Sequence, residues 1–139
     1  MTRRRFIGVS ATATFSFQVV PSRVFGANSR LAVAGIGSGG KGRADITGAT
    51  KAGADIVALC DVDESRAAAM FKTHTKAKRF TDFRVMLEKM GGSIDACTIS
   101  TPDHTHAAAT SMAMKMGKHC YTQKPLTHDV YEARHLTRL

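Results

Sequence analysis

The sequence predicts an α/β fold, a doubly wound parallel sheet, on the basis of two observations. Short apolar runs typical of buried strands recur along the chain, and segments with helical spacing of their apolar residues lie between them. The first run, at 31–36, leads directly into a glycine-rich turn, which is typical of the first strand-to-helix connection in such sheets. Length and composition suit one compact domain rather than two.

Strands and helices are expected to alternate from the first run to the end of the chain. Strands are expected at 31–36, 56–60, 78–80, 94–100 and 119–123. Helices are expected after the glycine turn, at 64–74, 83–90 and 105–116, and from 128 onward. Asp63 and Asp82 precede two of these helices as N-caps, and Gly91 and Gly117 close two. Strands that alternate with helices in this way form a parallel sheet, because each helix serves as a crossover.

The N-terminal segment 1–27, here called the leader, is set apart from the fold. Arg3, Arg4 and Arg5 precede a mildly apolar stretch that ends at Val20, and small and polar residues follow, as in a twin-arginine signal peptide. The stretch contains polar residues and is shorter than the ~20 apolar residues that a bilayer needs, so no stable membrane insertion is expected. We expect export to the periplasm by the twin-arginine machinery, with a disordered basic tail as the alternative.

Composition narrows the range of partners and sites. Part of the net charge of +9 comes from the leader, and the remaining lysines and arginines are scattered among acids without interleaved aromatic residues. A nucleic-acid partner is therefore not predicted. Cys60, Cys97 and Cys120 fall at or inside expected strands and show no CxxC spacing. This pattern favours buried free thiols over a zinc site or a disulfide framework.

The turn after the first strand carries a dinucleotide-binding pattern. Gly35, Gly37 and Gly40 follow the GxGxxG spacing. We expect Gly35 to turn the chain off the strand, Gly37 to leave room for a pyrophosphate, and Gly40 to let the helix pack close to the sheet. Ser38 and Gly39 complete the turn, and the helix that follows would hold phosphates with its free N–H groups and positive dipole end.

Asp61 ends the second apolar run, about 20 residues beyond the glycines. An acid at this position can accept hydrogen bonds from the hydroxyls of the adenosine ribose, and its charge would repel a 2′-phosphate. The expected cofactor is therefore NAD, with NADP less favoured. The alternative, in which the glycines only shape a tight turn, stays open at this point.

A polar segment, 101–106, follows the fourth expected strand. It lies at the carboxyl edge of the sheet, where open α/β folds bind their ligands. Asp103 or Thr105 can cap the next helix, so the segment also has a purely structural interpretation. His104 and His106 have no third ligand nearby in the sequence, and no metal site is predicted.

Lys124 follows the fifth expected strand at the same edge of the sheet. With the adenine end of the cofactor held by Asp61, this edge places Lys124 toward the nicotinamide end. Lys124 is therefore the candidate catalytic residue, as proton donor or acceptor. The alternative is an ordinary solvent-facing lysine in a loop.

Four motifs together resemble the Gfo/Idh/MocA oxidoreductases: AGIGSGGKG, CDVD, STPDHTHA and TQKPL. The resemblance covers 30–139 and implies a Rossmann domain that binds NAD(P), followed in the family by a second α/β domain. It implies that Thr101 and Pro102 line the cofactor, that His104 or His106 lies near the nicotinamide, and that Lys124 belongs to the family's Glu-Lys-Pro motif beside the reacting carbon.

The chain departs from the family pattern in two places. Gln123 stands where the family has a glutamate, so the charge that would accompany Lys124 is absent. The chain is also expected to stop before the second domain, where the family keeps its catalytic base.

The resemblance implies an NAD(P)-dependent oxidoreductase that acts on a sugar or cyclic polyol by hydride transfer. The 139-residue chain alone is expected to be inactive. An NAD-dependent glycoside hydrolase of the same family and a non-catalytic cofactor-binding fragment are the alternatives. The sequence leaves substrate, reaction direction and oligomeric state open, and a homo-oligomer is compatible with it.

Overall fold

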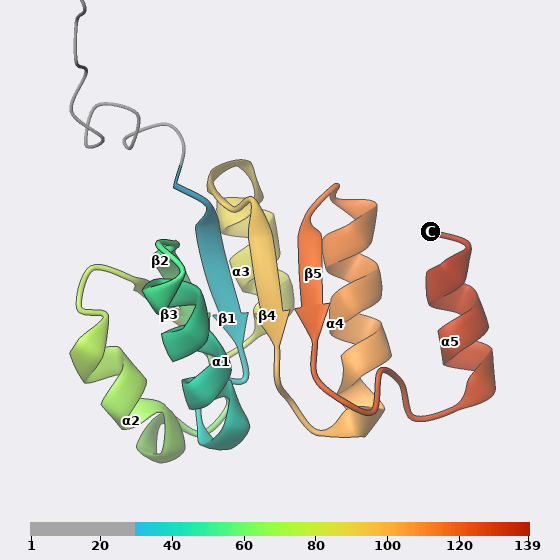
Figure 1. The fold of residues 1–139 in the computed structure, drawn as a ribbon, viewed down its shortest axis with the longest axis horizontal. Helices are drawn as coiled ribbons and strands as arrows, with labels where there is room; N and C mark the ends of the chain where they lie inside the picture. The colour runs from blue at the N-terminus through green and yellow to red at the C-terminus, as the bar shows by residue number, and fades with distance from the viewer. Residues whose placement is uncertain (1–29) are drawn as a thin grey trace, which may run out of the picture.

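The computed structural model describes residues 30–139, which form a five-stranded parallel sheet in the order β3-β2-β1-β4-β5 (Figure 1). The strands are β1 (Ala32–Ile36), β2 (Asp55–Cys60), β3 (Lys78–Phe80), β4 (Ala96–Ile99) and β5 (His119–Thr122). The helices are α1 (Gly40–Lys51), α2 (Glu64–Thr73), α3 (Phe83–Met90), α4 (Asp103–Lys115) and α5 (Val130–Thr137), with a short 3-10 helix, η1 (Gly91–Ser93), after α3. The predicted leader lies outside the described residues.

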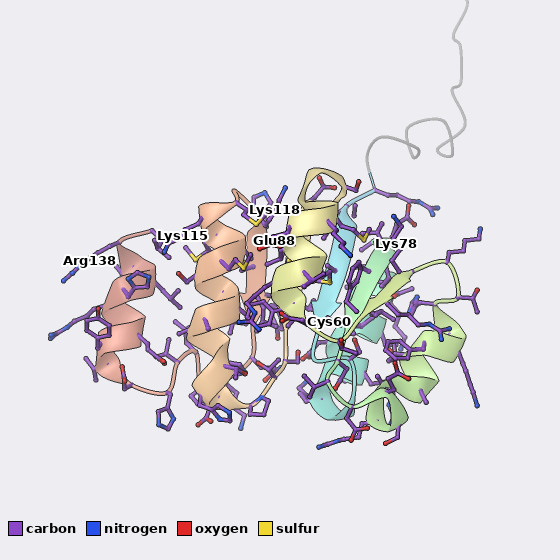
Figure 2. The ribbon with its side chains drawn as sticks, turned by 180° about the vertical axis from the view of Figure 1, so that it is seen from behind. Cys60, Lys78, Glu88, Lys115, Lys118 and Arg138 are labelled. Atoms are coloured by element: carbon purple, nitrogen blue, oxygen red, sulfur yellow. The ribbon has the colours of Figure 1, made fainter. Side chains whose placement is uncertain are left out.

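Helices cover both faces of the sheet, which confirms the doubly wound fold. On one face lie α1 and α2 (Figure 1). They bury a cluster that includes Ile46, Leu59 and Phe71. On the other face, α3 and α4 cover a second cluster, which includes Met86 and Ile99. Figure 2, turned by 180° from Figure 1, shows these two helices in front of the sheet. The central strands β1, β2 and β4 are buried along most of their length between the two helical layers, which explains their apolar sequences. The edge strands β3 and β5 are more exposed and more polar.

Two helix starts follow the sequence prediction. Asp63 caps α2 by accepting the N–H groups of Ser65 and Arg66, and Asp82 caps α3 by accepting the N–H of Arg84. These caps satisfy backbone donors that have no partner inside the helix.

The starts of α4 and α5 differ from the prediction. The residue before α4 is Pro102, whose carbonyl oxygen accepts the N–H of Thr105 at 3.0 Å. Asp103 is therefore the first helical residue, and the expectation that Asp103 or Thr105 caps this helix is wrong. Asp103 suits the first turn because its charge is favourable at the positive end of the helix dipole, so the helix begins two residues earlier than the apolar pattern indicated. α5 is capped by Asp129, whose Oδ1 accepts the N–H of Glu132 at 2.8 Å.

The three cysteines are free thiols, as predicted. Cys60 and Cys97 are buried, and Cys120 is half-buried. Burial raises the pKa of the Cys60 and Cys97 thiols to about 12, so both stay protonated near neutral pH.

All five strands run in the same direction, so the loops that follow them meet at one edge of the sheet (Figure 1). The predicted site residues lie in the glycine turn after β1 and in the loops that follow β2, β4 and β5. None of the helices in residues 30–139 combines the length and the apolar content that a bilayer span requires.

Candidate cofactor site

The turn after β1 is made by Gly37 rather than Gly35. Gly35 is a residue of β1 itself, and a Cβ there would lie 2.6 Å from Cδ1 of Ile46 on α1. Gly37 has a φ of +80°, which favours glycine, and its N–H donates to the carbonyl oxygen of Cys60 at 2.8 Å. The expectation that Gly35 turns the chain is therefore wrong. Gly35 instead leaves room for α1 against the sheet.

Close packing at the start of α1 depends on Gly42 rather than Gly40. A Cβ on Gly42 would overlap the carbonyl oxygen of Gly37, whereas a Cβ on Gly40 would meet nothing nearer than 3.7 Å. Gly39 is the residue before the helix. The glycines at 37, 39 and 42 repeat the GxGxxG spacing two residues later than predicted. Sequence reasoning could have found this register, because it starts right after the strand.

Asp61 fastens this turn to the end of β2. Its Oδ2 accepts the N–H groups of Ser38 and Gly39, each at 2.8 Å, and its Oδ1 accepts the N–H of Asp63 at 3.0 Å. A carboxylate has about four acceptor positions, so one on Oδ1 stays open for a ribose hydroxyl. The hydroxyl of Ser38 is buried and donates to the carbonyl oxygen of Cys60 at 3.2 Å, so this side chain supports the turn.

A cleft of about 290 Å³ opens at the carboxyl edge of the sheet beside the turn. Of the residues predicted to bind the cofactor, its lining includes Gly37, Gly39, Gly40, Asp61, Thr101 and Pro102. The lining does not include Gly35, Ser38, His104, His106 or Lys124. It also includes Lys41, which belongs to the glycine-rich motif but was not predicted as a site residue. Arg66 and Phe83 also line the cleft, and no motif indicated them because folding alone brings these helical positions to the turn.

A wider depression, of about 690 Å³, lies at the opposite edge of the sheet. Its lining includes Arg30, Asp55, His74 and Lys78, close to where β2 and β3 begin. None of the predicted site residues contributes to it, and open α/β sheets bind ligands at the carboxyl edge. The smaller cleft is therefore the candidate cofactor site.

The smaller cleft fits the pyrophosphate of a dinucleotide. Gly37 and Gly39 leave the backbone bare, and the N–H groups of Gly40 and Lys41 occupy the first turn of α1, where no helical acceptor exists for them. Thr101 Oγ1 is buried and has no hydrogen-bond partner among residues 30–139. An unpaired buried hydroxyl destabilises a protein by roughly 1–3 kcal/mol. A polar group of a bound ligand would remove this cost by forming a hydrogen bond with Oγ1 of Thr101.

His106 joins the loops that follow β4 and β5. Its side chain is buried, with Nδ1 2.7 Å from the carbonyl oxygen of Pro125 and Nε2 2.7 Å from that of Thr101. Carbonyl oxygens only accept, so both contacts are hydrogen bonds at once only when the ring carries both protons. No ring nitrogen is left for a ligand. His106 therefore holds the two loops together. The position of His104 or His106 near the nicotinamide, which the resemblance implies, stays a prediction.

His104 and Lys124 are exposed residues outside the cleft. Nδ1 of His104 lies 3.6 Å from Oδ1 of Asp103, its neighbour in the first turn of α4. Lys124 lies in the loop after β5, and its backbone N–H donates to Oε1 of Gln123 at 3.1 Å. The assignments of His104 to the nicotinamide side and of Lys124 to proton transfer stay predictions.

The strand order, the glycine turn and the cleft together define a dinucleotide-binding domain of the Rossmann type. The chain belongs to the Gfo/Idh/MocA oxidoreductase family: residues 29–139 match the family's NAD-binding Rossmann fold. The resemblance seen in the four sequence motifs is thereby confirmed.

Three relatives illustrate this membership. UDP-N-acetylglucosamine 3-dehydrogenase from Acidithiobacillus ferrooxidans is 31% identical over 75% of the chain and 31% of its own length. Inositol 2-dehydrogenase/D-chiro-inositol 3-dehydrogenase from Lacticaseibacillus casei is 33% identical over 73% and 30%. The crystal structure of myo-inositol dehydrogenase from Lactobacillus casei, in complex with NAD(H) and myo-inositol, has a TM-score of 0.70 and 29% identity over 78% of the chain and 32% of its own. The chain thus spans about a third of these relatives' length.

Proposed function

We propose that the protein is an NAD-dependent oxidoreductase that acts on a sugar or cyclic polyol by hydride transfer. The observation that carries the proposal is the cleft in which the bare glycine backbone, the first turn of α1 and Asp61 converge. The relatives named above are dehydrogenases of a sugar nucleotide and of inositols. Because the chain spans about a third of their length, the reaction of the whole protein is part of the proposal.

Along the carboxyl edge, different residues would bind the parts of NAD and transfer the proton. The N–H groups of Gly40 and Lys41 would hold the pyrophosphate, and the open position on Oδ1 of Asp61 would accept a ribose hydroxyl. Thr101 and Pro102 would line the middle of the cofactor. NAD, when bound, supplies the hydride acceptor. Lys124 would give or take the proton of the substrate hydroxyl.

Cofactor choice tests the role of Asp61. Its carboxylate would repel the 2′-phosphate of NADP, so the wild-type chain should bind NADH more tightly than NADPH in calorimetric titrations. Asp61→Ala should weaken NADH binding and reduce the difference in affinity between NADH and NADPH. Tighter binding of NADPH by the wild-type chain would contradict the proposal, because Arg66 in the same cleft would then dominate recognition.

Turnover tests the role of Lys124. The 139-residue chain should bind NADH and show no turnover, and activity should appear when the chain is joined to a second α/β domain. In that longer protein, Lys124→Met should lower kcat roughly 10²- to 10⁴-fold with NADH affinity nearly unchanged. Lys115→Met, an exposed lysine in the last turn of α4, is the matched control. Undiminished kcat in Lys124→Met would show that another residue transfers the proton. Cleavage of a glycoside without net formation of NADH would favour the hydrolase alternative.

We also propose that the leader directs export of the folded protein by the twin-arginine machinery. Exchange of Arg3 and Arg4 together for lysine keeps the charge but removes the arginine pair that this machinery reads. The variant should stay in the cytoplasm when both proteins are followed by cell fractionation. Normal export of the variant would favour the basic-tail alternative.

A further inference from the structure

A nearly buried carboxylate on α1 reaches across the carboxyl edge to the loop that carries Lys124. The side chain of Asp45 is 5% exposed. It accepts hydrogen bonds from Nζ of Lys41 at 2.8 Å and from Oγ of Ser100 at 2.7 Å. It also accepts from Nε2 of Gln123, at 3.2 Å to Oδ1 and 3.1 Å to Oδ2. Asp45 therefore connects α1 with the ends of β4 and β5.

The amide of Gln123 has one orientation that satisfies both of its neighbours. Nε2 donates to the carboxylate of Asp45, while Oε1 accepts the backbone N–H of Lys124 at 3.1 Å. The reversed amide would set its oxygen against the carboxylate and its NH₂ group against the N–H of Lys124, so two contacts would become repulsive. A continuous chain of hydrogen bonds thus runs from Asp45 through Gln123 to the backbone of Lys124.

This arrangement explains the glutamine at 123. A glutamate there would bring a second carboxylate within hydrogen-bonding distance of Asp45, and two such groups cannot both stay ionised at low cost. An amide opposite a carboxylate avoids this conflict and adds a donor. A negative charge does face the side chain at 123, and it comes from Asp45 on α1.

We propose that Asp45 is a positioning residue for Lys124 and that it acts through Gln123. We also propose that the pair works equally well when the amide is at position 45 and the carboxylate is at position 123. This inference rests on the proposed function, in which Lys124 meets the substrate. Asp45 would touch neither the substrate nor the reacting atoms. It sets the position of the Lys124 backbone, and with it the point from which the side chain reaches the substrate.

A double-mutant cycle tests the proposal with three variants: Asp45→Asn, Gln123→Glu and the reversed pair that combines both. In the longer protein, Gln123→Glu should lower kcat about tenfold or more with KM nearly unchanged, because two carboxylates then face each other. Asp45→Asn should cause a smaller loss. The reversed pair should return kcat to within about threefold of the wild type. Asp55→Asn, an exposed carboxylate at the opposite edge, is the control and should change nothing.

Hydrogen exchange of the Lys124 backbone amide provides a readout that needs no activity. Each single variant should speed the exchange of this amide, and the reversed pair should restore its protection. A reversed pair that performs no better than Gln123→Glu, in kcat and in exchange, would overturn the proposal. Restored protection without restored kcat in an active enzyme would also overturn it, because the contact would then be structural only.

Failure of the proposed function gives a different pattern. If the wild-type chain binds no NADH and the longer protein shows no dehydrogenase activity, the proposed function is wrong. The exchange cycle then still decides whether Asp45 positions the Lys124 backbone.

Discussion

The two halves of the carboxyl edge are built in different ways. On the side of β1 and β2, the turn is held by backbone N–H groups bonded to Asp61 and by glycines that allow close approach, all within a stretch of about thirty residues. On the side of β4 and β5, the loops are held by side chains, one of which comes from a distant part of the chain. Asp45 bonds to Ser100 and Gln123, which lie 55 and 78 positions further along the sequence. His106 bridges the loops that follow β4 and β5.

Sequence motifs are therefore more informative for the side of β1 and β2 than for the side of β4 and β5. A site made by local backbone geometry leaves a spacing in the sequence, because the same few residues must turn, cap and pack. A site made by long-range side-chain contacts leaves no spacing, since its partners are brought together only by the sheet. On the proposed function, the first half would hold the pyrophosphate and the ribose of NAD, and the second half carries Lys124, the proposed proton-transfer residue.

The largest expected effect is on the glycine side. Gly42→Ala would push a methyl group into the carbonyl oxygen of Gly37, so the turn and α1 must separate. We expect NADH binding to be lost in calorimetric titration, with a destabilisation of roughly 1–3 kcal/mol in urea unfolding. Gly48→Ala lies in the same helix with no atom within 4 Å of the added methyl group, and should stabilise by about 0.5–1 kcal/mol. Unchanged NADH affinity in Gly42→Ala would show that the close approach is not needed.

The next effect concerns His106 on the other side. His106→Asn cannot bridge the carbonyl oxygens of Thr101 and Pro125, so the hydrogen bonds that join the two loops are lost, at about 0.5–1.5 kcal/mol for each bond. We expect the free energy of unfolding to fall by roughly 1–2 kcal/mol in urea titrations. The same change at exposed His104 should stay within about 0.5 kcal/mol of the wild type. Equal effects at the two positions would rule out the bridging role.

A smaller effect is expected from the charge of Asp45. Burial pushes the pKa of Asp45 up, but the hydrogen bonds from Lys41, Ser100 and Gln123 outweigh it, so the pKa lies below its ordinary value of 3.8. A carboxyl whose pKa is lowered on folding stabilises the protein above its unfolded-state pKa. That contribution is lost as the pH falls through the folded-state value.

Urea unfolding of the wild type and Asp45→Asn checks this expectation. The wild type should be the more stable near neutral pH, and its advantage should shrink at about pH 3. The control is Asp55→Asn, whose partner Arg30 is exposed, and it should show little difference at either pH. An Asp45→Asn difference that is equal at both pH values would contradict the assignment.

Much of the fold could be predicted from the sequence because local signals agreed with one another. The Asp63 and Asp82 caps, the five strands and the alternation of strands with helices all follow from short-range patterns. The predicted start of α4 was two residues late because apolar spacing was weighed above Asp103, an acid that is favourable in the first turn of a helix.

The site was predicted in part, for identifiable reasons. Two overlapping GxGxxG registers exist between 35 and 42, and the spacing alone cannot choose between them. The end of β1 decides in favour of the second, because the turn must follow the strand. Asp45 had no signal at all, since its role depends on Gln123, 78 residues away.

Titration of the 139-residue chain with NADH, followed by backbone amide NMR, tests the central claim most directly. If the cleft beside the glycine turn is the cofactor site, binding should saturate, and the largest shifts should fall on the amides of 37–42 and of Thr101. No saturable binding by a folded chain would contradict the account. Shifts centred on Asp55 and Lys78, in the wider depression at the opposite edge, would contradict it as well.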